Sequence, residues 1–150
     1  MESFIAFLFW LSFGILLYIY VGYILLLKIL TFFYRQSHDI DSAYTPTITL
    51  LFSAHNEREA LPQKVESLKK IQYPRDKLQI IAISDGSTDG TAEFLQTQEG
   101  IQTQVLQENV GKNAALNLAL PNAKGEILFF TDANTVLHPH CFRAIARNYA

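Results

Sequence analysis

The chain has 150 residues, a net charge of -2 and a single cysteine, Cys141. This balance lacks the basic surplus typical of nucleic-acid-binding proteins, so no nucleic acid is expected among its partners. One cysteine excludes an intrachain disulfide, which is consistent with a reducing compartment. The length suits one modest domain, but the apolar residues are concentrated at the N-terminus.

The stretch from Ser3 to Leu27 contains no charged residue. As a helix rising about 1.5 Å per residue it would extend roughly 37 Å, which exceeds the ~30 Å hydrocarbon core of a bilayer. A signal peptide is the competing interpretation, but its apolar region spans only about 7–15 residues and follows a basic segment. Residues 1–34 are therefore predicted to form a single transmembrane anchor.

The distribution of positive charge predicts the orientation of this anchor. All 12 Lys and Arg residues lie at or after Lys28, and Lys28 and Arg35 flank the apolar stretch. The positive-inside rule places this flank in the cytoplasm. We therefore expect a single-pass protein of the cell membrane with a cytoplasmic C-terminal domain, residues 47–150, joined to the anchor by a polar linker, residues 35–46.

Within residues 47–150, β-rich apolar runs alternate with segments of helical periodicity. Leu61, Val65 and Leu68, for example, mark one face of a helix, with Pro62 in its first turn. Such alternation with short connections predicts an α/β domain, with a mainly parallel sheet covered by helices on both faces. The predicted strands are 47–52, 78–84, 103–107 and 126–131; the predicted helices begin near 61 and 91, cover 111–120, and begin again near 139.

Three polar loops, "SAHNE", "SDGSTDGT" and "TDANT", follow predicted strands. Ligands of parallel sheets bind beyond the carboxyl ends of the strands, where these loops would meet. Asp85 ends a strand and can accept hydrogen bonds from a base or a ribose. The alternative is an ordinary strand–helix turn in which Asp89 or Ser87 caps the helix.

Asp132, in the third loop, is suited to bind a hard divalent cation. Asn134 would add a neutral oxygen ligand on the same side if the chain stays extended. The alternative for this loop is an Asx turn that ends the strand. His138 and His140 flank Pro139, and are interpreted as exposed residues before a helix rather than as metal ligands.

Four segments together resemble the motifs of the family 2 glycosyltransferases: "FSAHNE", "IAISDGSTDGT", "NVGKNAALNLAL" and "ILFFTDANT". The resemblance extends from about Pro46 to Ala150 and implies the nucleotide-binding half of a GT-A (Rossmann-like) domain. It implies transfer of a sugar from a nucleotide diphosphate sugar, expected to be UDP-linked, to an acceptor hydroxyl in polysaccharide or glycoconjugate synthesis. The expected partners are this donor, a glycan or lipid-linked acceptor, and the membrane.

The resemblance also implies roles for individual residues. Asp132 would be the main ligand of Mg²⁺ or Mn²⁺, with Asn134 at the position of the family's second aspartate. Ser84 stands where the family usually has the first aspartate of a pair, and Asn134 is the second departure. The nucleotide-sugar pocket would be lined by Ala54, Asn56, Glu57, Asp85, Gly86, Lys112 and Asp132.

The family's general base and its later "Q-x-x-R-W" motif come from the second half of the domain, so the base is expected beyond residue 150. The only tryptophan is Trp10, within the apolar stretch. Residues 47–150 are therefore interpreted as a glycosyltransferase-like domain truncated at its C-terminal side and inactive by itself. The alternatives are a non-catalytic, membrane-anchored protein that binds a nucleotide sugar or a partner, and a truncated product that does not fold stably.

Overall fold

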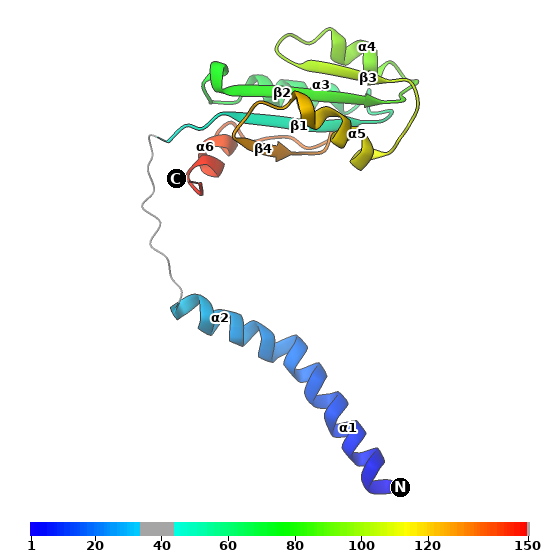
Figure 1. Cartoon of the computed structure of the whole chain (residues 1–150), viewed down its shortest axis with the longest axis vertical. Coiled ribbons are helices and arrows are strands. Elements are labelled where there is room, and N and C mark those ends of the chain that lie inside the picture. Colours follow the sequence, from blue (N-terminus) through cyan, green and yellow to red (C-terminus); the bar gives the residue numbers. More distant parts are fainter. Residues whose placement is uncertain (34–43, 150) are drawn as a thin grey trace. The chain divides into compact units, whose positions relative to one another are not determined.

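The computed structural model describes residues 1–33 and 44–149. The chain divides into an N-terminal unit, Met1–His38, and a C-terminal unit, Asp39–Ala150 (Figure 1). Most of the predicted linker, residues 35–46, lies outside the described residues. The predicted domain boundaries therefore stay predictions.

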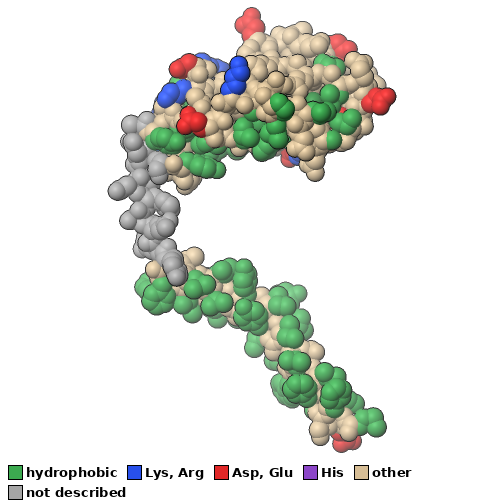
Figure 2. Space-filling view, viewed as in Figure 1, with side chains coloured by type: hydrophobic (Ala, Val, Ile, Leu, Met, Phe, Trp, Pro, Cys, Tyr) green, Lys and Arg blue, Asp and Glu red, His purple; other side chains and the backbone are tan. Residues whose placement is uncertain are grey.

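The N-terminal unit contains one long apolar helix. It consists of α1 (Glu2–Leu17), a π-helical segment η1 (Tyr18–Gly22) and α2 (Tyr23–Phe33). Within its 32 residues, an 18-residue window has a mean hydropathy of 2.3, and none of that window is buried. Apolar side chains cover the face of this helix seen in Figure 2. A helix that is apolar all round needs an apolar environment, so its length and composition suit a membrane span.

The C-terminal unit is built on a four-stranded sheet: β1 (Ile48–Ala54), β2 (Leu78–Asp85), β3 (Gln102–Leu106) and β4 (Ile127–Phe130). The strand order is β3-β2-β1-β4 and every pair is parallel, which confirms the predicted α/β class. From β1 the chain moves outward to β2 and β3, and then crosses to β4 on the other side of β1 (Figure 1). Such a reversal between β1 and β4 is the place where open α/β sheets bind ligands.

Helices cover both faces of the sheet. On one face α3 (Leu61–Lys69), α4 (Thr91–Gln96) and α6 (Cys141–Ala146) contribute Leu61, Leu68, Leu95 and Phe142 to the larger core. On the other face α5 (Lys112–Ala119) packs Ala115, Leu116 and Ala119 against β1 and β2. Because both faces of β1 are covered, its sequence is almost continuously apolar, as in other buried parallel strands.

The structure differs from the sequence-based prediction at the end of β1 and at the start of α4. β1 continues two residues beyond the predicted end at residue 52, because Ser53 and Ala54 keep their register with β2. Gly90 occupies the N-cap of α4 with a φ of 86°, and neither Asp89 nor Ser87 does. Asp89 instead accepts a hydrogen bond from the Thr91 amide at 3.0 Å, so it still satisfies the start of the helix.

Asp85 and Gly86 fasten the β3–α5 loop, residues 107–111, to the carboxyl end of β2. The buried Asp85 carboxylate accepts hydrogen bonds from the amides of Val110 at 2.8 Å and Gly111 at 3.0 Å. Gly86 has a φ of 60°, and a Cβ atom there would lie 2.3 Å from the Asn109 nitrogen. These contacts therefore fix the start of α5 at the edge of the sheet.

Lys64 is a charged residue in the larger core. It lies on the apolar face of α3 and is fully buried. Its ammonium donates to Thr131 Oγ1 at 3.0 Å and to the Thr135 carbonyl at 2.9 Å, and lies 5.5 Å from the centre of the Phe52 ring. Burial lowers the pKa of Lys64 to about 8, although the charge of Asp132 opposes the shift.

We expect Asp85→Asn to lower the free energy of unfolding by about 1–3 kcal/mol, because one of the two backbone amides would face an NH₂ group instead of an acceptor. Denaturant titration of the full chain in detergent measures this loss. Asp76→Asn is the matched control: Asp76 is exposed in the turn before β2, so its replacement should change stability by less than about 0.5 kcal/mol. Equal stability of the two variants would contradict the anchoring role of Asp85.

The buried ammonium of Lys64 predicts a pH-dependent stability. Below pH 8 both the folded and the unfolded chain carry the charge, and the cost of burying it is present in full. Between the folded pKa of about 8 and the ordinary value of 10.5, the folded state releases its proton first and the cost is relieved. Over this range wild type should gain about 3 kcal/mol relative to Lys64→Met, in paired denaturant titrations. A constant difference between the two proteins would show that Lys64 does not titrate as proposed.

Candidate functional site

Four loops meet at the carboxyl edge of the parallel sheet, as the sequence predicted for three of them. They are residues 55–60 after β1, 86–90 after β2, 107–111 after β3 and 131–135 after β4. The first and last flank the point between β1 and β4 where the strand order reverses. This edge therefore holds the candidate functional site.

The loops after β1 and β2 are bonded tightly to each other. The Asn56 side chain accepts a hydrogen bond from the Thr88 amide at 2.9 Å, and the Glu57 amide donates to Thr91 Oγ1 at 3.0 Å. The Arg58 amide donates to the Asp89 carboxylate at 3.0 Å. Asn56 has a φ of 53°, a left-handed conformation that asparagine tolerates better than most residues. Such a conformation persists only where its surroundings enforce it, so the loop pair is held in one shape.

An open polar groove of about 720 Å³ lies along these loops. It brings Asn56 and Glu57, from the β1 loop, together with Asn134, from the β4 loop. The Arg58 guanidinium lies over the Phe94 ring at 4.3 Å and adds a cation to the same region. The groove is thus lined by hydrogen-bonding groups of both signs, as a polar ligand with anionic parts requires.

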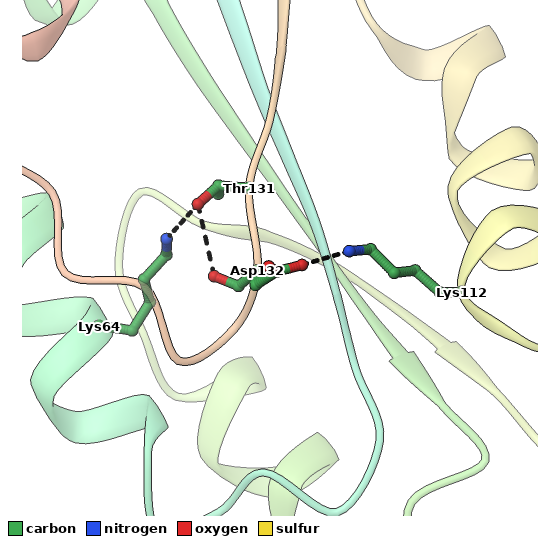
Figure 3. A network of polar contacts seen from close by, with 4 residues as sticks. All are labelled: Lys64, Lys112, Thr131 and Asp132. Atoms are coloured by element: carbon green, nitrogen blue, oxygen red, sulfur yellow. Dashed lines mark hydrogen bonds and ion pairs between the residues drawn. The ribbon is translucent and has the colours of Figure 1, made fainter. Parts of the chain in front are cut away.

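Asp132 follows β4 and forms an ion pair with Lys112, the first residue of α5 (Figure 3). Both side chains are more than half exposed. The hydrogen bond from the Lys112 ammonium, and then its positive charge, lower the pKa of Asp132 below its usual range. Asp132 is therefore ionised at neutral pH and already attracts a cation.

The oxygen ligands in the β4 loop suit a divalent cation that is also bound by a phosphate group. Within residues 1–33 and 44–149, no three His, Cys, Asp or Glu residues come together to hold a metal. Mg²⁺ is commonly held by one or two carboxylates together with substrate phosphates and water. The carboxylate of Asp132 and the amide oxygen of Asn134 fit that pattern, and they do not form a cage made of protein ligands alone.

The β4 loop turns, whereas the sequence-based argument for Asn134 assumed an extended chain. The Thr135 amide donates to the Asp132 carbonyl at 3.3 Å, and the side chain of Ala133 is buried in the core. Asn134 is exposed at the turn and lines the groove. Asp132 and Asn134 thus lie on a turn, and not on an extended strand whose alternation would place them on the same side.

Three other predicted site residues, Ala54, Asp85 and Gly86, do not line the groove. Ala54 is buried at the end of β1, and Asp85 and Gly86 lie under the β3–α5 loop. Ser84, the departure from the usual aspartate, is fully buried, and its hydroxyl has no hydrogen-bond partner in the described part of the chain. The predicted roles of these residues in nucleotide binding stay predictions.

Among the residues at the site that were not predicted are Arg58, His55 and Lys64. His55 Nδ1 lies 2.6 Å from the Asp85 carbonyl, which can only accept, so Nδ1 carries the proton and joins the first two loops. Nothing in the spacing of the sequence points to His55. Lys64 had a detectable signal, because it lies between Leu61 and Leu68 at helical spacing and so places a cation in an apolar stripe.

Comparison with known proteins agrees with this arrangement. The family described as "Glycosyl transferase family 2" matches residues 49–150. A probable glycosyltransferase, YdaM of Bacillus subtilis, is 30% identical over 96 residues, which are 59% of this chain and 23% of that protein. Poly-beta-1,6-N-acetyl-D-glucosamine synthase of Staphylococcus aureus is 31% identical over 106 residues, which are 69% of this chain and 25% of the synthase. The chain thus spans about a quarter of the length of these relatives.

Solved structures show the same fold. The mannosyltransferase PcManGT of Pyrobaculum calidifontis, in complex with GDP-Man and Mn²⁺, superposes with a TM-score of 0.65 at 28% identity, over 81% of this chain and 40% of that one. Residues 1–349 of S. aureus TarS, in complex with UDP, superpose with a TM-score of 0.63 at 21% identity, over 67% of this chain and 31% of that one. With a family match over most of its length and a GT-A-like sheet, the chain belongs to glycosyltransferase family 2.

Proposed function

We propose that the chain is the donor-binding half of a membrane-bound glycosyltransferase. It would bind a nucleotide diphosphate sugar, from which the whole enzyme transfers the sugar to an acceptor hydroxyl. The observation that carries this proposal is the ionised Asp132 carboxylate, which follows the carboxyl end of β4, is paired with the Lys112 ammonium and belongs to the same loop as Asn134, which lines the polar groove. Membership of family 2 supports it.

Within this half, each group has a distinct task. Asp132 and Asn134 would hold Mg²⁺ or Mn²⁺, which when bound neutralises the charge that grows on the departing diphosphate. A cation held by Asp132 would replace Lys112 as its partner, and the Lys112 ammonium would then be free to bind a phosphate oxygen. Asn56 and Glu57 would bind the nucleotide along the groove. The Asp85 carboxylate would keep the β3–α5 loop in place at the same edge of the sheet. The general base that takes the acceptor's proton is proposed to lie beyond residue 150.

The donor is proposed to be UDP-linked, on the resemblance of the "SDGSTDGT" loop to the family's motif, with the sugar undefined. The structural relative with GDP-Man and Mn²⁺ makes GDP the natural competitor in any test. The similarity to a polysaccharide synthase supports a glycan or lipid-linked acceptor and a polysaccharide or glycoconjugate product. Binding of the donor without transfer is the behaviour expected of this half alone.

We further propose that the apolar helix anchors the domain to the cell membrane, with the C-terminal unit in the cytoplasm. The observation is the uncharged stretch of residues 3–27 within the helix, followed by Lys28 in its last part, on the flank where the positive-inside rule places the cytoplasm. In sealed vesicles whose cytoplasmic face is outward, trypsin should digest the C-terminal unit. In right-side-out vesicles the unit should be protected until detergent is added. The reverse pattern would overturn the orientation.

Calorimetry with UDP and Mn²⁺ tests the donor site directly. Wild type should bind UDP only when Mn²⁺ is present, and Asp132→Ala should weaken this binding at least about tenfold, or 1.4 kcal/mol. Repeating the titration with GDP in place of UDP measures the preference for the nucleotide base. Asp76→Ala, which removes an exposed carboxylate in the turn before β2, is the matched control and should bind like wild type. Equal binding by wild type and Asp132→Ala would exclude Asp132 as a principal ligand.

A further inference from the structure

Lys64 links α3 to the loop that carries the proposed cation ligands. Figure 3 shows its side chain reaching from α3 to Thr131, with Asp132 directly beyond and Lys112 on the far side of Asp132. The same ammonium donates to the carbonyl of Thr135 at 2.9 Å. Thr131 precedes the segment Asp132–Asn134 and Thr135 follows it. One buried group is therefore bonded to both ends of the segment.

Other contacts also hold the loop: the Thr131 amide donates to the Leu51 carbonyl of β1 at 3.1 Å, and Asp132 is paired with Lys112. The Thr135 amide closes the turn onto the Asp132 carbonyl at 3.3 Å, and Ala133 is buried against the core. Asp132, Asn134 and Thr135 are exposed. Without the ammonium, the carbonyl of Thr135 would lose its donor and the two ends of the turn would lose their common partner. Among the contacts of the described residues, the Lys64 ammonium is the group bonded to both ends of the turn, so its loss would remove one constraint on the turn's shape.

Stability alone does not account for a lysine at this position. An ammonium buried without a bonded carboxylate is costly, and an apolar side chain of similar volume would fill the core at no such cost. The two hydrogen bonds offset part of that cost, and they are made to the candidate site. The cost of burial and the direction of these bonds together indicate a role in the site.

We propose that Lys64 is a positioning residue, which holds the Asp132–Asn134 turn in the shape that binds a divalent cation together with a nucleotide diphosphate. This inference rests on the proposed function. Lys64 itself touches neither ligand, since it is buried behind the loop. Groups that orient metal ligands from behind typically change metal affinity about 10–100-fold when they are removed.

Lys64→Met, in the full chain in detergent, is the decisive variant because methionine keeps the apolar stem and removes the donors. Thr131→Val removes only one acceptor and should give a smaller effect of the same sign. Lys69→Met, on the exposed side of the same helix, is the matched control. We expect melting temperatures near that of wild type for all three, because in Lys64→Met the lost hydrogen bonds offset the relieved cost of the buried charge.

Two measurements separate positioning from a general structural role. In the ligand-free chain, hydrogen exchange of the Thr135 amide should accelerate about five- to tenfold in Lys64→Met, the equivalent of about one lost hydrogen bond, while the amides of β1 keep their protection. In the presence of UDP, Mn²⁺ affinity measured by electron paramagnetic resonance should fall about 10–100-fold in Lys64→Met and stay unchanged in Lys69→Met.

The outcomes distinguish this inference from the proposed function. If wild type binds Mn²⁺ with UDP and Lys64→Met binds it equally well, the positioning role is wrong while the proposed function stands. A wild type that binds no Mn²⁺ with UDP would contradict the proposed function and the positioning role with it. Loss of affinity that accompanies a lower melting temperature and general loss of protection in β1 would assign Lys64 to the core alone.

Discussion

The central constraint in this protein is the burial of β1 between two parallel neighbours. Its register with β2 and β4 aligns the carboxyl ends of the three strands, so the loops that follow them meet at one edge. Because the strand order reverses at β1, the β4 loop lies beside the β1 loop. It contributes Asn134 to the lining of the groove. The polar residues after residue 54 and those after residue 130 come together only through this arrangement.

A second feature is the placement of positive charge around one carboxylate. Asp132 is paired with Lys112 from α5 on the exposed side, and the buried Lys64 of α3 supports its loop from behind. The helices that contribute these lysines cover opposite faces of the sheet. An ionised aspartate with cations on both sides suits a loop that is proposed to bind a metal ion together with a diphosphate, since both change the local charge.

Much of the fold follows from local patterns. The four strands and the helices were predicted close to their observed bounds, because β-rich apolar runs, helical spacing and residues such as Pro62 act over a few neighbours. The errors are small in extent but come from tertiary contacts and backbone conformation: β1 continues to Ala54 because of pairing with β2, and Gly90 takes the N-cap position expected for Asp89 or Ser87. Pairing partners and left-handed backbone conformations depend on contacts that spacing along the chain does not reveal.

By itself, the sequence determined the α/β class, the apolar N-terminal helix and the family, because each depends on composition, periodicity or motif order. Only the tertiary structure decided which polar residues face the groove and which support it. Asp85 looks in sequence like an exposed loop residue, yet its carboxylate is buried and bonds two amides of a loop that is distant along the chain. Lys64 stands out in sequence only as a cation within an apolar helical stripe, and the structure shows that it bonds to the β4 loop. The physical reason is that hydrogen bonding of buried charges is settled by packing between segments, which no local pattern encodes.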